Sequence, residues 1–401
     1  MKKVSRDTKT FILISIIVGL AMSGDAMMYC ILPVTPENFR ITVFQIGILL
    51  SVNRFIRLIT NELSNFIVAG TESYKPLVAG VWMAAFVTLG YAIPLGFWWL
   101  LALRILWGAC FSLLRIEAYI ATLRVSSDEN VGRLMGWFAT IKSGIYRVMM
   151  ILSGFLADML NPLAVPVIFA ALIFGSLFFI RNQEQMWRDT AVAEPAVVDD
   201  KKKSKSRMHI SNIGMLLIVG LVTFVTATAS TMTTSLRGRL IVDVILPGSG
   251  LNIGAATFAG FFAMLTPVIM MAAPIFGYFG DKFGCRRPLI ISMTGQAAII
   301  ILFAVFRLWY IVLGLLVLDL VTESATQVLR TAYAGKSSLP GEQALFMNRF
   351  STFQDAGSAA GPFLGYAIYA VTNDFTGIAL VMVPLIMVSI FILFCMEKKN
   401  A

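Results

Sequence analysis

The sequence predicts an all-α, polytopic membrane protein with twelve transmembrane helices in two pseudo-symmetric six-helix bundles. Of its 401 residues, 58% are hydrophobic and only 13% are charged, and the mean hydropathy is +0.81. Soluble globular proteins carry about 25% charged residues. The chain holds a dozen apolar stretches of roughly 20 residues, the length that crosses a bilayer core as a helix. These runs do not alternate with polar residues, so membrane β-strands are not expected.

The apolar runs set the bounds of the predicted spans. They fall at residues 11–34, 43–69, 76–93, 98–122, 132–158, 162–180, 210–236, 254–280, 288–306, 308–330, 343–370 and 376–396. The first run follows a basic flank and contains small residues, as a cleaved signal peptide would. It continues through MMYCILPV to a membrane-spanning length, so an uncleaved first helix is the favoured interpretation.

Basic residues are distributed unevenly between the two sides of the predicted membrane. With the N-terminus inside, the inside segments carry 21 Lys and Arg, whereas the outside loops carry four: Arg40, Arg237, Arg239 and Arg307. This bias predicts that both termini are cytoplasmic, and we expect a multi-pass protein of a bacterial inner membrane. The net charge of +10 then reflects topology, and no nucleic-acid partner is expected.

One long polar segment divides the chain. Residues 181–209 contain KKKSKSR and separate an N-terminal six-span domain (1–180) from a C-terminal one (210–401). We expect a cytoplasmic linker whose basic side chains face anionic lipid headgroups. The four Cys residues are scattered and the only histidine is His209, so neither a disulfide framework nor a metal site is expected. The sequence contains no phosphate-binding loop, so we expect no cofactor and no use of ATP.

The two halves contain a weak repeat. The segments RILWGACFSLLRIEAYIATLR (104–124) and YIVLGLLVLDLVTESATQVLR (310–330) align without a gap at an offset of 206 residues. In this register polar and glycine positions coincide: Gly108 with Gly314, Glu117 with Glu323, and Arg124 with Arg330. Such repeats are typical of secondary transporters, whose binding site lies between the repeats.

The stretch GYFGDKFGCRRPLI (277–290) places four charged residues between two apolar runs. Its pattern, Gly-x-x-x-Asp-Lys-x-Gly-x-Arg-Arg, resembles the signature loop of the major facilitator superfamily. The resemblance implies that Gly277 packs closely on a neighbour, that Gly284 permits a tight turn, and that Asp281 accepts hydrogen bonds from a helix N-terminus. It also implies that Arg286 and Arg287 pair with acidic groups or lipid phosphate, so that the loop acts as a gate.

Further motifs support this resemblance. Two E-x6-R elements, Glu117 to Arg124 and Glu323 to Arg330, resemble those of sugar porters and imply a gate network at the ends of spans four and ten. Arg104-x-x-x-Gly108 resembles the superfamily's span-four signature. The pattern Gly357-x-x-x-Gly361-Pro362-x-x-Gly365 resembles an antiporter motif whose small residues allow close helix contact and whose proline bends the helix. In the matching loop of the first half, VAGTESYKPL, Ala69 stands where the signature has Asp281. The Gly-Pro motif stands in span eleven instead of span five. No subfamily is therefore assigned.

Charged residues inside the predicted spans are the candidate binding residues. Each would cost about 2.5–3.5 kcal/mol at the bilayer centre unless paired or hydrated. Arg54, Arg57 and Asn61 recur at i, i+3 and i+7, on one face of span two. The positive charges of Arg54 and Arg57 require a partner, which is either a substrate anion or a carboxylate in a static salt bridge, for example Asp25 or Glu62. The candidate substrate-binding residues are Arg54, Arg57, Asn61, Arg115, Lys142 and Arg147.

Carboxylates inside the spans are the candidate proton carriers, because burial favours the protonated form. Asp25, Asp319 and Asp355 are the candidates, and a structural pair with an arginine is the alternative for each. Asp355 is the favoured one because it stands beside the Gly-Pro motif.

These features predict a secondary transporter that works by alternating access and is coupled to protons. Six of the seven basic residues within spans lie in the first half, which favours a small organic solute that carries a carboxylate or is zwitterionic. The alternative is proton-driven efflux of hydrophobic or cationic compounds. A transporter-like sensor or assembly factor that moves nothing is an alternative from another class. No catalytic constellation is visible, so an enzyme is not expected, and we expect a monomer in contact with membrane lipid.

Overall fold

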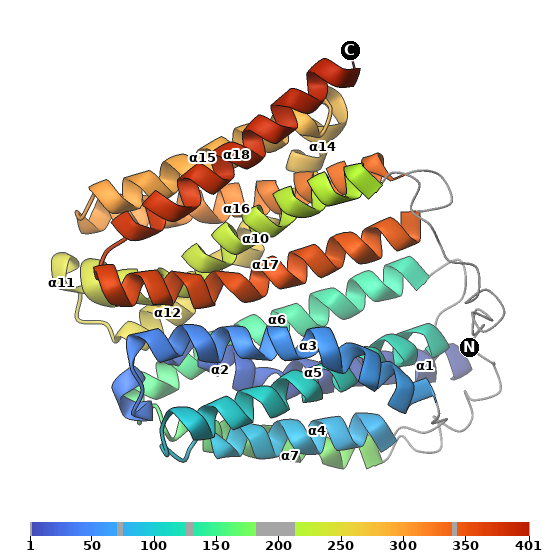
Figure 1. Cartoon of the computed structure of the whole chain (residues 1–401). Helices are drawn as coiled ribbons and strands as arrows, with labels where there is room; N and C mark the ends of the chain where they lie inside the picture. Colours follow the sequence, from blue (N-terminus) through green and yellow to red (C-terminus); the bar gives the residue numbers. More distant parts are fainter. Residues whose placement is uncertain (1, 70–74, 126–130, 182–212, 339–342, 401) are drawn as a thin grey trace. The chain divides into compact units, whose positions relative to one another are not determined.

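The computed structural model of the chain describes residues 2–69, 75–125, 131–181, 213–338 and 343–400 (Figure 1). Within these ranges every secondary-structure element is a helix. The chain divides into two compact units, Met1–Ile41 with Phe55–Arg207, and Thr42–Arg54 with Met208–Ala401. The predicted linker lies, from residue 182 on, outside the described residues.

Seven α-helices and one short 3-10 helix precede the polar segment. They are α1 (Lys2–Ala21), α2 (Ser23–Ile31), η1 (Pro36–Phe39), α3 (Val43–Ala69), α4 (Lys75–Gly90), α5 (Phe97–Val125), α6 (Val131–Met159) and α7 (Val165–Arg181). The boundary between the units falls inside α3, so its first residues belong to the second unit. The first predicted span is divided at Met22 into α1 and α2, and this break puts Asp25 in the first turn of α2, where the helix dipole favours a negative charge.

The remaining helices belong to the second unit. They are α10 (Ile213–Leu240), the π-helical turn η2 (Ile241–Ile245), α11 (Leu246–Ser249), α12 (Ala255–Ala263), α13 (Leu265–Met270), α14 (Ala273–Phe283), α15 (Arg286–Val305), α16 (Trp309–Ser337), α17 (Gln343–Thr372) and α18 (Thr376–Asn400). The predicted seventh span, 210–236, ends too early. Arg237 and Arg239, which were predicted in an outside loop, lie within α10, and the helix continues through η2 and α11.

Helix pairing follows the same scheme in both units. In the first unit α1 and α2 pack on α6, while α4 packs on α5 and α7. In the second unit α10 packs on α17, while α15 packs on α16 and α18 (Figure 1). In terms of the predicted spans, span one packs on span five, and span three packs on spans four and six. Spans seven to twelve repeat that order, as a repeat of six helices requires.

The described helices include enough apolar ones for a polytopic membrane protein. Seven are long and apolar enough to cross a membrane, or eight if the bent pair Ala255–Ile269 and Ala273–Phe283 is one span. Lys75–Gly90 and Val165–Phe179 are shorter apolar helices. The helices α6 and α17 have 29 and 30 residues, and both carry charged candidate residues.

The glycines of α17 bring it close to α10. A Cβ atom on Gly357 would lie 2.4 Å from the Phe224 carbonyl oxygen, and one on Gly361 would lie 2.7 Å from the Thr228 carbonyl oxygen. Any larger residue at these positions would therefore push the helices apart. The close contact that the Gly-Pro motif implies is present, and its partner is α10.

Candidate functional site

Three basic side chains from three helices of the first unit form a cluster. Arg57 lies on α3, Arg115 on α5 and Lys142 on α6, and all three are half-buried. Both arginines lie close enough to Lys142 to repel its charge. Neither Arg115 nor Lys142 forms an ion pair with a carboxylate in the described part of the chain. We refer to these three residues as the basic cluster.

Aromatic rings hold the basic cluster in place. The Arg57 guanidinium lies 4.8 Å from the centroid of the Phe111 ring, and the Lys142 ammonium lies 5.4 Å from that of Phe138. Such cation–π contacts favour a cation over the ring face. They offset part of the cost of three like charges in a segment that spans the membrane.

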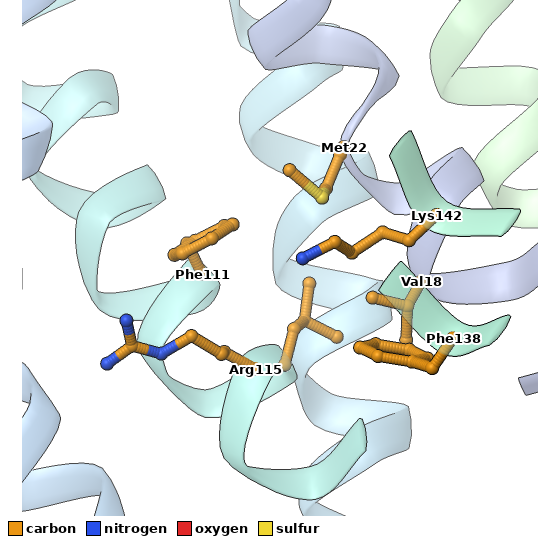
Figure 2. A pocket seen from close by; sticks show the side chains of 7 residues that line it. Val18, Met22, Phe111, Arg115, Phe138 and Lys142 are labelled. Atoms are coloured by element: carbon orange, nitrogen blue, oxygen red, sulfur yellow. The ribbon is translucent and has the colours of Figure 1, made fainter. Parts of the chain in front are cut away.

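Arg115 and Lys142 of this cluster line a small cavity. It has a volume of about 10 Å³, room for about one water molecule. Figure 2 shows the Lys142 side chain pointing into the space beside Met22 and Phe111. The lining residues are Val18, Met22, Phe111, Leu114, Arg115, Phe138 and Lys142. No carboxylate is among them. In Figure 2 the Arg115 guanidinium points away from the Lys142 ammonium.

The other predicted substrate-binding residues lie elsewhere. Arg54 belongs to the second unit, where its Nη1 donates to the Ser358 carbonyl oxygen at 2.7 Å. Arg147 is half-buried on α6 with its guanidinium over the Tyr146 ring. The side chain of Asn61 lies outside the described residues. The predicted face of span two is therefore divided, and only Arg57 joins the basic cluster.

Asp25 forms a buried ion pair with Arg104. Their closest atoms are 2.6 Å apart, and the side chains of Arg104 and Asp25 are 0% and 11% exposed. The Tyr146 hydroxyl also donates to Asp25, at 3.5 Å. A structural pair with an arginine was the predicted alternative for Asp25, and Arg104 is such an arginine. Sequence reasoning could not select Arg104, which is 79 residues away along the chain.

A second buried ion cluster lies in the second unit. Nη2 of Arg237 on α10 donates to Asp319 at 2.9 Å and to Glu323 at 2.7 Å, both on α16. The Thr233 hydroxyl donates to Asp319, and the Thr234 hydroxyl donates to Glu323. Arg237 was missed as a site residue because the Thr- and Arg-rich end of α10 was predicted to be a loop.

The two ion clusters connect equivalent helices with opposite polarity. In the first unit the acid is on the first span and the base on the fourth, α5. In the second unit the base is on the first span, α10, and the acids are on the fourth, α16. The pairing of the helices is thus common to both units, whereas the sign of each charge is not.

Asp355 differs from the other two predicted proton carriers. Its carboxylate on α17 is half-buried. It forms no ion pair and no side-chain hydrogen bond among the residues that the structure describes. By contrast, Asp25 and Asp319 each face an arginine at less than 3 Å.

The signature loop joins α14 to α15, and Gly284 adopts a φ of +75°, which a glycine allows. Asp281 accepts a hydrogen bond from Lys336 of α16 at 2.8 Å, in place of the expected helix N-terminus. Gly277 was expected to be closely packed, but a Cβ there would meet nothing within 4 Å, and Gly280 is the close contact. At the start of α15, Arg286 is half-buried and Arg287 is exposed.

Of the E-x6-R residues, Glu323 is half-buried, whereas Glu117 and Arg330 are buried. Glu117 is 2% exposed, and Arg330 is 5% exposed. The Arg330 Nη1 donates to the Thr226 hydroxyl at 2.8 Å, which ties α16 to α10. The side chain of Arg124 lies outside the described residues. A role of these elements as a gate network stays a prediction.

The long apolar helices are those of a multi-pass membrane protein. The sequence profile of the Major Facilitator Superfamily matches residues 14–271 and 219–400, so the chain belongs to that superfamily. It is accordingly a secondary transporter and not an enzyme. No curated protein sequence matches the chain.

Solved structures share this fold over almost the whole chain. The nucleoside transporter NupG has a TM-score of 0.72 at 13% identity, over 97% of this chain and 99% of that one. A POT family transporter in complex with 5-aminolevulinic acid has a TM-score of 0.70 at 10% identity, over 98% and 96%. A bacterial homologue of the human lysosomal transporter Spinster, inward-facing and occupied, has a TM-score of 0.67 at 12% identity, over 98% and 97%.

Proposed function

We propose that the protein transports a small organic solute that carries a carboxylate, and that the basic cluster binds this carboxylate. The observation that carries the proposal is that Arg115 and Lys142 line one cavity without a carboxylate in its wall, and form no ion pair in the described part of the chain. Arg57 lies near Lys142. Two cations without an ion pair in the described part of the chain are costly inside a membrane unless an anion pairs with them. An anionic substrate supplies that charge, and the arginines offer it fork-shaped donors.

The surroundings of the basic cluster favour a solute with an apolar part. The rings of Phe111 and Phe138 and the side chain of Met22 line the same cavity as Lys142. A flexible methionine and two aromatic rings provide apolar contact that adapts to the ligand. One structure with the same fold contains 5-aminolevulinic acid, which is consistent with a zwitterionic substrate.

A thermal-shift screen of the purified protein tests this proposal. The probes are small carboxylic acids, including amino acids, each paired with its carboxamide. We expect acids to raise the melting temperature and their amides not to, because only the acid carries the charge. Lys142→Met should remove the response, whereas the control Arg239→Met, in a pair with Asp243 outside the cluster, should keep it. Equal responses to acids and amides would contradict the proposal.

Coupling to protons is the second part of the proposal, with Asp355 as the carrier. Asp355 is the one predicted carrier of the three without an ion pair in the described part of the chain. Protonation of Asp355 would therefore break no ion pair among the described residues. In proteoliposomes, a pH gradient should drive uptake by the parent protein but not by Asp355→Asn. Exchange of the solute without a gradient should persist in that variant.

The direction of transport and the topology are also proposed. The resemblance of the Gly361-Pro362 motif to that of antiporters favours exchange of the solute for protons, hence export. We propose twelve spans with both termini in the cytoplasm of a bacterial inner membrane, in domains 1–180 and 210–401, as a monomer. The alternative cargo, hydrophobic or cationic compounds, would appear as a response to such probes in the thermal-shift screen. Binding of acids without any uptake would instead indicate a sensor.

A further inference from the structure

Pro362 leaves one carbonyl of α17 without its helical partner. The helix runs from Gln343 to Thr372 with this proline inside it. Proline has no backbone N–H, so the carbonyl four residues earlier loses its intrahelical hydrogen bond. That carbonyl belongs to Ser358. A carbonyl without a donor is particularly unfavourable in a helix that crosses a membrane.

Arg54 supplies the missing donor. Its Nη1 lies 2.7 Å from the Ser358 carbonyl oxygen, and the contact is partly buried. A hydrogen bond from a guanidinium is stronger than one between neutral groups. The charged residue of α3 is therefore aimed at the one carbonyl that Pro362 sets free.

The face of α3 around Arg54 fits α17 at the same place. A Cβ on Gly47 would lie 2.7 Å from the Pro362 carbonyl oxygen. The Phe44 and Phe363 rings have their centroids 6.4 Å apart. Phe44, Gly47 and Arg54 share one face at helical spacing. All of these residues belong to the second unit, which includes Thr42–Arg54.

We propose that Arg54 is a positioning residue that replaces the Pro362 N–H and thereby holds the first part of α3 on α17. This role goes beyond substrate binding, and it explains a charge in span two without a ligand. Because the contact exists only while the two helices are packed, Arg54 stabilises the conformation in which they touch. The proline and the arginine then form one functional pair, although 308 positions separate them in the numbering.

Cysteine cross-linking tests this pair without any substrate. Phe44→Cys and Phe363→Cys are combined in the full-length protein, with the exposed Cys395 replaced by Ser. Arg54→Met should lower the disulfide yield about threefold or more, because the freed carbonyl loses a charged donor. In the Pro362→Ala background the helix supplies its own N–H, so Arg54→Met should change the yield little. Arg54→Lys, which keeps a donor, should retain most of the yield.

A matched control and a second readout make the test decisive. Arg57→Met, one turn further along α3 over the Phe111 ring, should not depend on Pro362. The second readout is the melting temperature of proteins that retain Phe44 and Phe363. The effect of Arg54→Met on the melting temperature is measured with Pro362 present and again in the Pro362→Ala background. An equal effect of Arg54→Met in both backgrounds, by either readout, would overturn the proposal. Neither readout involves transport, so the outcome is independent of the proposed substrate.

Discussion

Removal of Arg104 should strongly destabilise the protein, because the buried Asp25 carboxylate loses the cation of this ion pair. The closest atoms of the pair are 2.6 Å apart. At an effective dielectric constant of about 20, their attraction is about 6 kcal/mol, which desolvation partly offsets. Loss of one partner of a buried pair costs about 3–5 kcal/mol. For a unit of this size we expect the melting temperature to fall by roughly 6–20 °C.

The assay is the melting temperature of the purified protein in detergent. Arg104→Met should show the full loss, whereas Asp25→Leu combined with Arg104→Met should recover most of it, because no buried charge remains. The matched control is Arg239→Met, whose pair with Asp243 is 17% and 28% exposed. This pair is more exposed than Asp25–Arg104, so its loss should lower the melting temperature less. A single variant that melts like the control, or a double variant no better than the single one, would refute the reasoning.

The reversed polarity of the second unit extends this prediction. In the second unit the arginine lies on the first span, α10, and the two carboxylates lie on the fourth span, α16. The exchange Asp25→Arg with Arg104→Asp should therefore recover part of the stability that Arg104→Met loses. Failure of the exchange to improve on Arg104→Asp alone would show that the first unit requires one fixed polarity.

Three other variants test the second unit. Arg237→Met removes the base that two carboxylates share, so it should lower the melting temperature more than Glu323→Gln, which removes only one contact; equal losses would contradict the shared role. Gly361→Ala should cost about 1–3 kcal/mol by overpacking against α10, whereas Gly277→Ala, with nothing within 4 Å, is its control and should cost little. Asp281→Asn should leave folding intact but slow transport in proteoliposomes, since the contact with Lys336 loses its charge; transport at the parental rate would remove the gate role.

Much of the helical fold could be predicted because the apolar runs are long and uninterrupted. The predicted span 43–69 coincides with α3, Val43–Ala69, and span 98–122 lies within α5, Phe97–Val125. The end of α10 could not be found this way, because a π-helical turn and a Pro-Gly pair follow two arginines and look like a loop. Helix propensity is a local property of the sequence, so it could not show that Arg237 pairs with Asp319 of α16.

The site could be predicted in residue type more readily than in pairing. Charges in apolar helices indicated the candidate residues, and Arg57 and Arg115 both lie near Lys142. The periodicity of span two could not show that Arg54 and Arg57 serve different units, because tertiary packing decides that. Similarly, Gly277 was predicted to be tightly packed from a motif, whereas the closest approach falls on Gly280.

The most direct test of the basic cluster is the KM for uptake of one acid from the thermal-shift screen, measured in proteoliposomes. Loss of a charged hydrogen bond to the ligand costs about 1.5–3 kcal/mol, and each 1.4 kcal/mol is about tenfold in affinity. Lys142→Met and Arg57→Lys should therefore raise the KM, the former by about tenfold or more, while Arg239→Met should leave it unchanged. A KM that stays at the parental value in Lys142→Met would contradict binding of the substrate carboxylate by the basic cluster.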